Sequence, residues 1–506
     1  MPNPANSFYG CQPGSVIVGG KVSTPATSLT VTDTVHPRLY QRVGTAKTLM
    51  IGGSYTGPAT RIQARACPAG TGLTALESTY PFSTVVTNPT GGTFSASLSV
   101  PQGDGWVVQV RDAIDHAVGS TGTHVFGVGT FIALIGQSNM ENLFTVYAGA
   151  YCGAKGAYTH HGVFARLGNI NDNFPPNSFY DMNNGHGGDY AASGWTNDAG
   201  YYIGTYLTLL ANTLVLDLGC PVVILPYAAS GTTISVWQPG QTYLNNLLND
   251  VDTIGGDFEA AIWLQGENDA STGTSGATYQ SKLQTLFDTC KAHTGRSSSD
   301  FHFGVVVVGP ITNAYPGMVD EATAPIRKAQ LDFVAANTSN GAFLAGTDID
   351  GNLAGGSVHI DTPSQLNQAT RYAAAIKRRL SGASYGIEGP VITSASRAGT
   401  VVTVAVTQQG GAALLDGLGG SGGSLQGFRV FDSGIPMTIS STSISGNTIV
   451  LTLSATPSGT VTMDYAMANA PFGATTSPAA VCYDNQTIPG SAIGLPLQPK
   501  PLFTVL

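Results

Sequence analysis

The feature that most constrains this fold is a short, wholly apolar run that ends abruptly in small and polar residues. Residues 131–135 are all apolar, and Gly136, Gln137, Ser138 and Asn139 follow them directly. A run of this length is typical of a strand buried on both faces of a parallel sheet. In open sheets of that kind, ligands gather beyond the carboxyl ends of the strands. Ser138 is therefore predicted to lie where a nucleophile can act.

The same pattern recurs from residue 128 to about residue 381, where apolar runs alternate with helical periods. The apolar runs are residues 131–135, 221–226, 260–264, 303–308 and 342–344. The helical periods are residues 201–216, 243–251, 279–292, 322–336 and 365–380. This alternation predicts an α/β domain with a mostly parallel sheet and helices on both faces.

A long interval, residues 144–196, interrupts this alternation without any period of its own. It is rich in Asn, Gly and Tyr. Loops of this length inside a compact domain are usually functional. We expect it to form a wall of the substrate cleft.

The flanking segments have a different pattern, with short alternating runs broken by turn residues and no helical period. Such spacing predicts antiparallel β-sandwiches, the first of them immunoglobulin-like. The expected organisation is an N-terminal arm (1–27), a β-sandwich (28–127), the α/β domain (128–385) and a C-terminal β-sandwich (386–506).

Composition narrows the classes of function. Charged residues make up 10% of the 506 residues, against about 25% in average soluble proteins, and this pattern is common in extracellular and virion proteins. The net charge of −9 and the lack of a Lys/Arg cluster argue against a nucleic-acid partner. No apolar segment approaches the roughly 18 residues of a membrane span. The first 20 residues show no signal-peptide pattern, so we expect export by another route, trimming, or a place in a virion.

No metal or other cofactor is predicted. The six cysteines have no short pairing, which excludes the common zinc patterns and the C-x-x-C redox motif. Residues 348–352 begin like a calcium loop, but Leu353 and His359 stand where that loop needs Gly and Glu.

Three stretches of the central domain carry the parts of nucleophilic acyl transfer. Ser138 supplies a hydroxyl at one strand end, residues 263–269 supply amides and carboxylates at another, and His359 supplies an imidazole before the last helix. Acyl transfer needs a hydroxyl, a base for its proton and donors for the oxyanion. Each stretch alone is weak as a signal, but together at one sheet edge they favour a catalytic site.

These residues resemble the SGNH hydrolases, in particular the sialate O-acetylesterase and acetylxylan esterase branch. The matching motifs are Gly-Gln-Ser-Asn-Met at 136–140, Trp-x-Gln-Gly-Glu-x-Asp at 263–269, Val-His at 358–359, and Ser-Gly-Thr-Thr-Ile at 230–234 followed by Trp237. The resemblance implies a three-layer, flavodoxin-like hydrolase domain without a cofactor. It also implies an acetylated polysaccharide as substrate.

The resemblance assigns roles to individual residues. Ser138 would be the nucleophile and one oxyanion donor through its own N–H, and Gly231 would give a second N–H. The third donor would be the side-chain amide of either Gln265 or Asn268, and the choice stays open. His359 would be the general base. Gln137 and Trp237 are expected to contact the substrate, and the Trp237 ring could equally belong to the core.

One position departs from the superfamily pattern. An acidic residue usually stands three positions before the histidine, and here that position is Gly356. The candidates to orient His359 are Glu267, then Asp348, Asp350 and Asp361, or else a backbone carbonyl. Our working hypothesis is a Ser–His dyad, with Glu267 as the first candidate for a third catalytic residue.

The sequence thus predicts a carbohydrate O-acetylesterase that acts through a serine acyl-enzyme. Two alternatives remain: an esterase of lipid or aryl esters with the same machinery, and a glycan-binding or virion tail protein with a vestigial hydrolase fold. The flanking domains would bind polysaccharide, form a homo-oligomer or attach the enzyme to a larger assembly.

Overall fold

The structure is a computed structural model of the chain. It describes residues 16–18, 21–23, 25–32, 39–143, 162–165, 179–181, 205–253, 255–420, 422–473, 478–486, 488, 491 and 494–506. Apart from the short strands β12 (Gly162–Ala165) and β13 (Phe179–Asp181), the predicted cleft wall lies outside these residues. The chain divides into two compact units, Met1–Thr130 and Phe131–Leu506, which are taken in turn.

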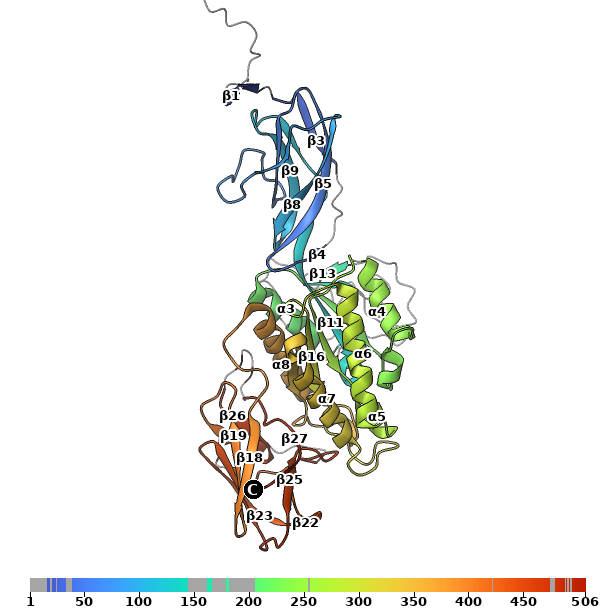
Figure 1. Cartoon of the computed structure of the whole chain (residues 1–506), viewed down its shortest axis with the longest axis vertical. Helices are drawn as coiled ribbons and strands as arrows, with labels where there is room; N and C mark the ends of the chain where they lie inside the picture. Colours follow the sequence, from blue (N-terminus) through green and yellow to red (C-terminus); the bar gives the residue numbers. More distant parts are fainter. Residues whose placement is uncertain are drawn as a thin grey trace, which may run out of the picture. The chain divides into compact units, whose positions relative to one another are not determined.

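The first unit consists of mostly antiparallel strands in two main sheets (Figure 1). One sheet has the order β3 (Ser28–Thr32), β5 (Ala46–Thr56) and β8 (Thr93–Pro101). The other contains β6 (Arg61–Pro68), β7 (Ser83–Thr87), β9 (Gly103–Asp112) and β10 (Gly119–Thr121), together with β4 (Leu39–Gln41) and the start of β11 (Phe126–Gly136). A short hairpin of β1 (Val16–Val18) and β2 (Lys21–Ser23) precedes them. Strand β8 alternates exposed and buried residues along its whole length, and both sheets contribute to one apolar cluster.

The second unit is built on a sheet with the order β13-β12-β14-β11-β15-β16-β17. Its further strands are β14 (Val222–Ala228), β15 (Ala260–Leu264), β16 (His302–Val307) and β17 (Ala342–Thr347). Strands β11, β15, β16 and β17 pair in parallel, one with the next. Their carboxyl ends therefore meet at one edge of the sheet.

Helices follow the strands close to where the sequence predicts them. They are α3 (Thr205–Leu218), α4 (Thr242–Thr253), α6 (Gly276–Thr294), α7 (Thr323–Asn337) and α8 (Thr362–Ser381). The expectation of an α/β domain on a mostly parallel sheet is confirmed.

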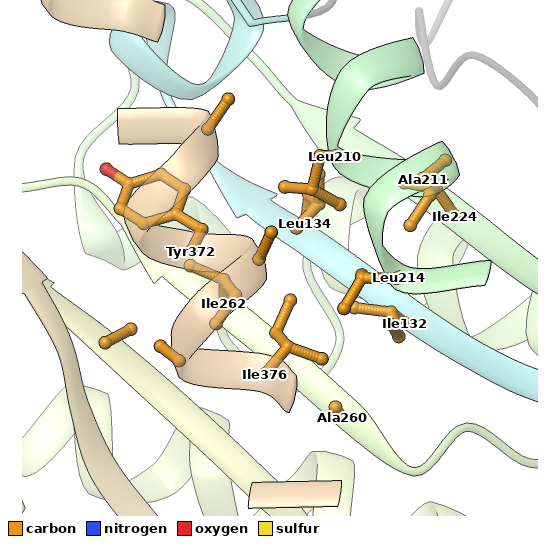
Figure 2. Packing of buried hydrophobic residues seen from close by; sticks show 14 of the residues in the cluster. Ile132, Leu134, Leu210, Ala211, Leu214, Ile224, Ala260, Ile262, Tyr372 and Ile376 are labelled. Atoms are coloured by element: carbon orange, nitrogen blue, oxygen red, sulfur yellow. The ribbon is translucent and has the colours of Figure 1, made fainter. Parts of the chain in front are cut away.

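The central strands are buried on both faces because helices cover each side. Successive strand residues point to opposite faces, so Ile132 and Ile262 pack against Leu214 of α3 and Ile376 of α8 (Figure 2). On the other face, the indole N–H of Trp263 donates to the hydroxyl of Tyr279 on α6 at 3.1 Å. Two-sided burial explains why these strands are continuous apolar runs in the sequence.

The C-terminal region (residues 386–506) returns to antiparallel strands. One sheet has the order β18 (Val391–Ala398), β19 (Val401–Thr407), β24 (Thr448–Leu453), β23 (Ile439–Ser445). Another has the order β22 (Ile435–Met437), β21 (Phe428–Asp432), β25 (Val461–Tyr465), β27 (Lys500–Thr504), and β20 (Leu414–Asp416) pairs with β26 (Cys482–Asp484). A shared apolar cluster fills the space between them.

Two further observations bear on the predictions. Cys67, Cys290 and Cys482 are buried free thiols. Among the helices that the structure describes, none is both long and apolar enough to cross a membrane.

Candidate active site

The site begins where β11 and β15 end side by side. Gly136 pairs with Leu264 in register, and a Cβ at Gly136 would lie 1.9 Å from the carbonyl oxygen of Leu264. Any other residue would clash with this carbonyl, so only glycine can occupy position 136. The short helix α1 (Ser138–Glu141) follows β11, and α5 (Glu267–Ser271) follows β15. Ser138 and Glu267 thus start two neighbouring helices at the same sheet edge.

His359 lies in the segment between β17 and α8, residues 348–361, which we call the histidine loop. The loop is closed on itself, because Ala354 N donates to His359 O at 2.7 Å and Asp361 N donates to Asn352 O at 2.8 Å. The His359 side chain is exposed, whereas Val358 and Ile360 on either side of it are buried. The imidazole therefore stands at the surface on a backbone that is anchored on both sides.

Asn139 connects the segment that carries Ser138 to this loop. Its side chain is 2% exposed. The amide nitrogen donates to Glu267 Oε1 at 2.6 Å and to the Val358 carbonyl at 3.1 Å, and its oxygen accepts the N–H of Ile360 at 3.1 Å. One amide thus brings the residue next to Ser138 together with Glu267 and both neighbours of His359.

The sequence motif contains Asn139, but motif reasoning assigned it no role. The signal was present: a polar residue directly after the candidate nucleophile, at the end of a wholly apolar strand. Such a side chain is buried and must find hydrogen-bond partners, and here its partners are the other two elements of the site.

In the described part of the chain, neither the Ser138 hydroxyl nor the His359 ring makes a hydrogen bond. Catalytic hydrogen bonds are often long without substrate and tighten when it binds. Asn139, the residue after Ser138, links the two segments, because its bonds reach the backbone on both sides of the histidine.

Glu267 does not contact His359 directly. Its Oε1 accepts from Asn139, the carboxyl is 1% exposed, and burial raises its pKa although the Asn139 bond acts in the opposite direction. The hydrogen bond of Glu267 therefore reaches the histidine loop through Asn139.

The three aspartates that were further candidates also have other partners. Asp348 accepts from the hydroxyl of Tyr372 at 2.8 Å, and burial raises its pKa to about 7. Asp350 forms a two-bond ion pair with Arg371 at 2.8 and 2.7 Å. Asp361 caps α8 by accepting from Ser364 N. Within the described residues, none of these three carboxylates bonds to the His359 ring.

The two candidate amide donors differ in their surroundings. Gln265 is 0% exposed, and its amide nitrogen already donates to Gln137 Oε1, the Thr232 carbonyl and Asp269 Oδ2, at 3.0, 3.0 and 2.6 Å. Both of its hydrogens are occupied inside the protein.

Asn268, in contrast, is partly exposed. Its amide nitrogen donates to the carbonyl of Gly231 at 2.6 Å, which leaves its second hydrogen free for a ligand. The same bond fixes Gly231, which has a φ of +68°, a conformation that favours glycine. Asn268 and Gly231 therefore form a connected pair beside the nucleophile strand.

The two residues expected to contact substrate are interior residues, which corrects that expectation. Gln137 is 1% exposed, and its oxygen accepts from Gln265, Gly266 and Asn268. Trp237 is also 1% exposed, and its ring stacks on Tyr243 at 5.2 Å. Both side chains support the site from within, because no face of either is open to a ligand.

The site combines a serine at a strand end, an exposed histidine before the last helix and an amide with one unused hydrogen, on one edge of a parallel sheet. This is the arrangement expected of an SGNH-type hydrolase domain. Within the described ranges, no group of three or more His, Cys, Asp or Glu side chains could hold a metal ion.

Comparison with known proteins agrees with this class. Residues 194–378 match the family model described as carbohydrate esterase, sialic acid-specific acetylesterase. This match agrees with the prediction from the motifs, the sialate O-acetylesterase-like branch of the SGNH hydrolases. No curated protein sequence matches the chain.

One solved structure shows a similar fold over nearly the whole chain. A carbohydrate acetylesterase from Xanthomonas citri is similar over 92% of this chain and 97% of that chain, with a TM-score of 0.60 and 18% identity. An acetylxylan esterase from Geobacillus stearothermophilus (12% identity, 50% and 94% covered) and a carbohydrate acetylesterase from Sinorhizobium meliloti (13% identity, 49% and 98% covered) each give a TM-score of 0.27.

Proposed function

We propose that the protein is a carbohydrate O-acetylesterase that works through an acyl-enzyme on Ser138. The observation that carries this proposal is the set of Asn139 hydrogen bonds, which joins the nucleophile strand to both neighbours of His359. The family model of sialic acid-specific acetylesterases supports the choice of an acetyl ester on a carbohydrate.

The steps follow from the positions of these groups. His359 takes the proton of the Ser138 hydroxyl while that oxygen attacks the acetyl carbonyl. The oxyanion forms beside the N–H groups of Ser138 and Gly231 and the amide of Asn268. His359 then gives its proton to the departing sugar hydroxyl, which leaves the acetyl group on Ser138. Water, deprotonated by His359, hydrolyses this ester and releases acetate.

Asn268 is our choice for the third oxyanion donor. Replacing Asn268 by Ala is expected to lower kcat by about 10²–10³-fold, because one preorganised donor is removed from the transition state. KM should change little, since the donor acts on the developing charge. Steady-state kinetics on p-nitrophenyl acetate measures both.

Thr272→Ala is the matched control for this variant. Thr272 follows α5 and its hydroxyl bonds only to carbonyls of that helix, so kcat should stay near the wild-type value. An Asn268→Ala enzyme with unchanged kcat would exclude Asn268 as the donor.

The substrate class is tested by acetate release from a panel of acetylated polysaccharides, with p-nitrophenyl acetate and a long-chain p-nitrophenyl ester beside them. Acetate from a polysaccharide is the expected result. Hydrolysis of the long-chain ester alone would indicate a lipid esterase. Polysaccharide binding without any hydrolysis would indicate a binding protein with a vestigial site.

The remaining parts of the proposal concern the setting of the enzyme. The two-sheet segments on either side, residues 28–127 and 386–506, are proposed as β-sandwich domains, the first of them immunoglobulin-like. Their strand orders and apolar clusters support this. The low charge supports an extracellular or virion-associated place. Acetylated polysaccharide is the proposed partner, and the flanking domains offer surfaces for a homo-oligomer or a larger assembly.

A further inference from the structure

Asn469 of the C-terminal region is hydrogen-bonded to the hydrolase fold by every polar group of its side chain. It is 6% exposed. Its Oδ1 accepts the N–H of Thr323 at 3.0 Å, and its amide nitrogen donates to Asn313 Oδ1 at 2.8 Å and to the Val319 carbonyl at 2.7 Å. Its backbone carbonyl accepts the N–H of Ile311 at 3.0 Å. This one residue fixes both ends of the loop that connects β16 to α7.

That loop in turn contacts the histidine loop. Thr312 N donates to the carbonyl of Ser357 at 2.9 Å. Ser357 lies two residues before His359, and Thr312 lies between two residues that Asn469 binds. A short chain of hydrogen bonds thus runs from the C-terminal region to the backbone that carries the imidazole.

Arg327 makes further hydrogen bonds between the hydrolase domain and the C-terminal region, beside Asn469. Its guanidinium is 0% exposed and donates to the Val308 and Gly309 carbonyls of the hydrolase domain at 3.0 and 2.7 Å. It also donates to the carbonyls of Ala466 and Asn469 in the C-terminal region at 2.8 and 3.2 Å. Burial lowers the pKa of Arg327 to about 9. A buried cation needs all its donors satisfied. These hydrogen bonds therefore favour one arrangement of the C-terminal region against the hydrolase domain.

A second junction reaches the start of the histidine loop. The hydroxyl of Tyr483, on β26, donates to Asp350 Oδ2 at 2.9 Å, the same carboxylate that pairs with Arg371 of α8. Ile349, next to Asp350, is 0% exposed and belongs to the apolar cluster of the C-terminal region. The loop is therefore held by the C-terminal region both at its beginning and near its histidine.

We propose that the C-terminal region is part of the catalytic unit, in which Asn469 and Tyr483 are positioning residues for His359. The inference rests on the proposed function, since it assigns these residues a role in acyl transfer. No described acid bonds to the His359 ring, so the backbone of its loop determines where the imidazole stands. A displacement of about 1 Å in such a group costs about 10²-fold in rate.

The test uses the full chain with Asn469→Ala and Tyr483→Phe. We measure kcat and KM on p-nitrophenyl acetate, and the rate at which diethyl p-nitrophenyl phosphate labels Ser138, well below the unfolding temperature. For Asn469→Ala, kcat and the labelling rate are expected to fall together by about 10–100-fold, with KM within about threefold. Tyr483→Phe should lower both by a smaller factor, because it removes one hydroxyl and keeps the ring.

Asp416→Ala is the control for loss of stability in the C-terminal region. Asp416 is buried and accepts only backbone N–H groups of its own region, from Leu418, Gly420 and Gly422. This variant should unfold at a lower temperature and keep its kcat. Such a result separates positioning of His359 from general stability.

The inference is overturned if both junction variants keep the wild-type kcat and labelling rate and lose only thermal stability, or if only KM rises. Should Asn469→Ala fail to fold, Tyr483→Phe decides by the same criteria. A wild type that is labelled at Ser138 but releases no acetate refutes the proposed function, while its labelling rates still decide this inference. A wild type that is not labelled refutes both.

Discussion

Replacing Ser138 by Ala is expected to abolish acetate release, with kcat lower by about 10⁴-fold or more, because no other group can form the acyl-enzyme. The fold should survive this change. Ser138 is 6% exposed, and its hydroxyl makes no hydrogen bond within the described part of the chain, so the variant loses no hydrogen bond there. Acetate release and thermal unfolding, measured on both proteins, check the two halves of this prediction.

A covalent probe makes this test independent of the substrate. Diethyl p-nitrophenyl phosphate should add one diethylphosphoryl group to the wild type, on the peptide that contains Ser138, and none to the variant. Activity that persists in Ser138→Ala with wild-type kcat would mean that another residue is the nucleophile.

Replacing His359 by Ala is expected to lower kcat by about 10³-fold or more, because the Ser138 hydroxyl then has no base to take its proton. The His359 side chain is exposed, so its removal leaves an open space beside Ser138 rather than a cavity in the core. Imidazole added to the buffer can enter this space. We therefore expect imidazole to restore part of the activity in proportion to its concentration.

Two comparisons control for this result. His293→Ala removes a histidine at the end of α6 that contacts Asp252 at 3.0 Å, and it should leave kcat unchanged. Ser138→Ala should not respond to imidazole, since it has no hydroxyl to activate. A His359→Ala enzyme with wild-type activity would contradict the assignment of the base.

The elements of the hydrolase domain were predictable because its strands are buried on both faces. The apolar run at 260–264 is β15 with the same bounds, and the helical periods match α4, α6, α7 and α8 within a few residues. Local periodicity is a strong signal where each element packs along its whole length. The order of the motifs also predicted that Ser138, Glu267 and His359 lie at one sheet edge.

Contacts between distant residues were not predictable in the same way. The sequence left Gln265 and Asn268 as equal candidates, and the difference between them is that the amide of Gln265 is consumed by three buried acceptors. It offered Trp237 as a substrate contact or as a core residue, and the structure buries that ring against Tyr243. Exposure depends on what packs over a side chain, and a motif does not carry that information.

The alternation of strands and helices and the chemistry of Ser138 and His359 are local properties, so the sequence alone predicts them. The sequence also shows that Gly356 stands where an acidic residue is usual. It does not show which groups hold the backbone around His359 in place. Asn139 reaches Val358 across 219 positions of the chain, and Asn469 reaches Thr323 across 146. Only the folded chain brings these amides to the backbone around His359, because hydrogen bonds form between groups that are close in space, whatever their separation in sequence.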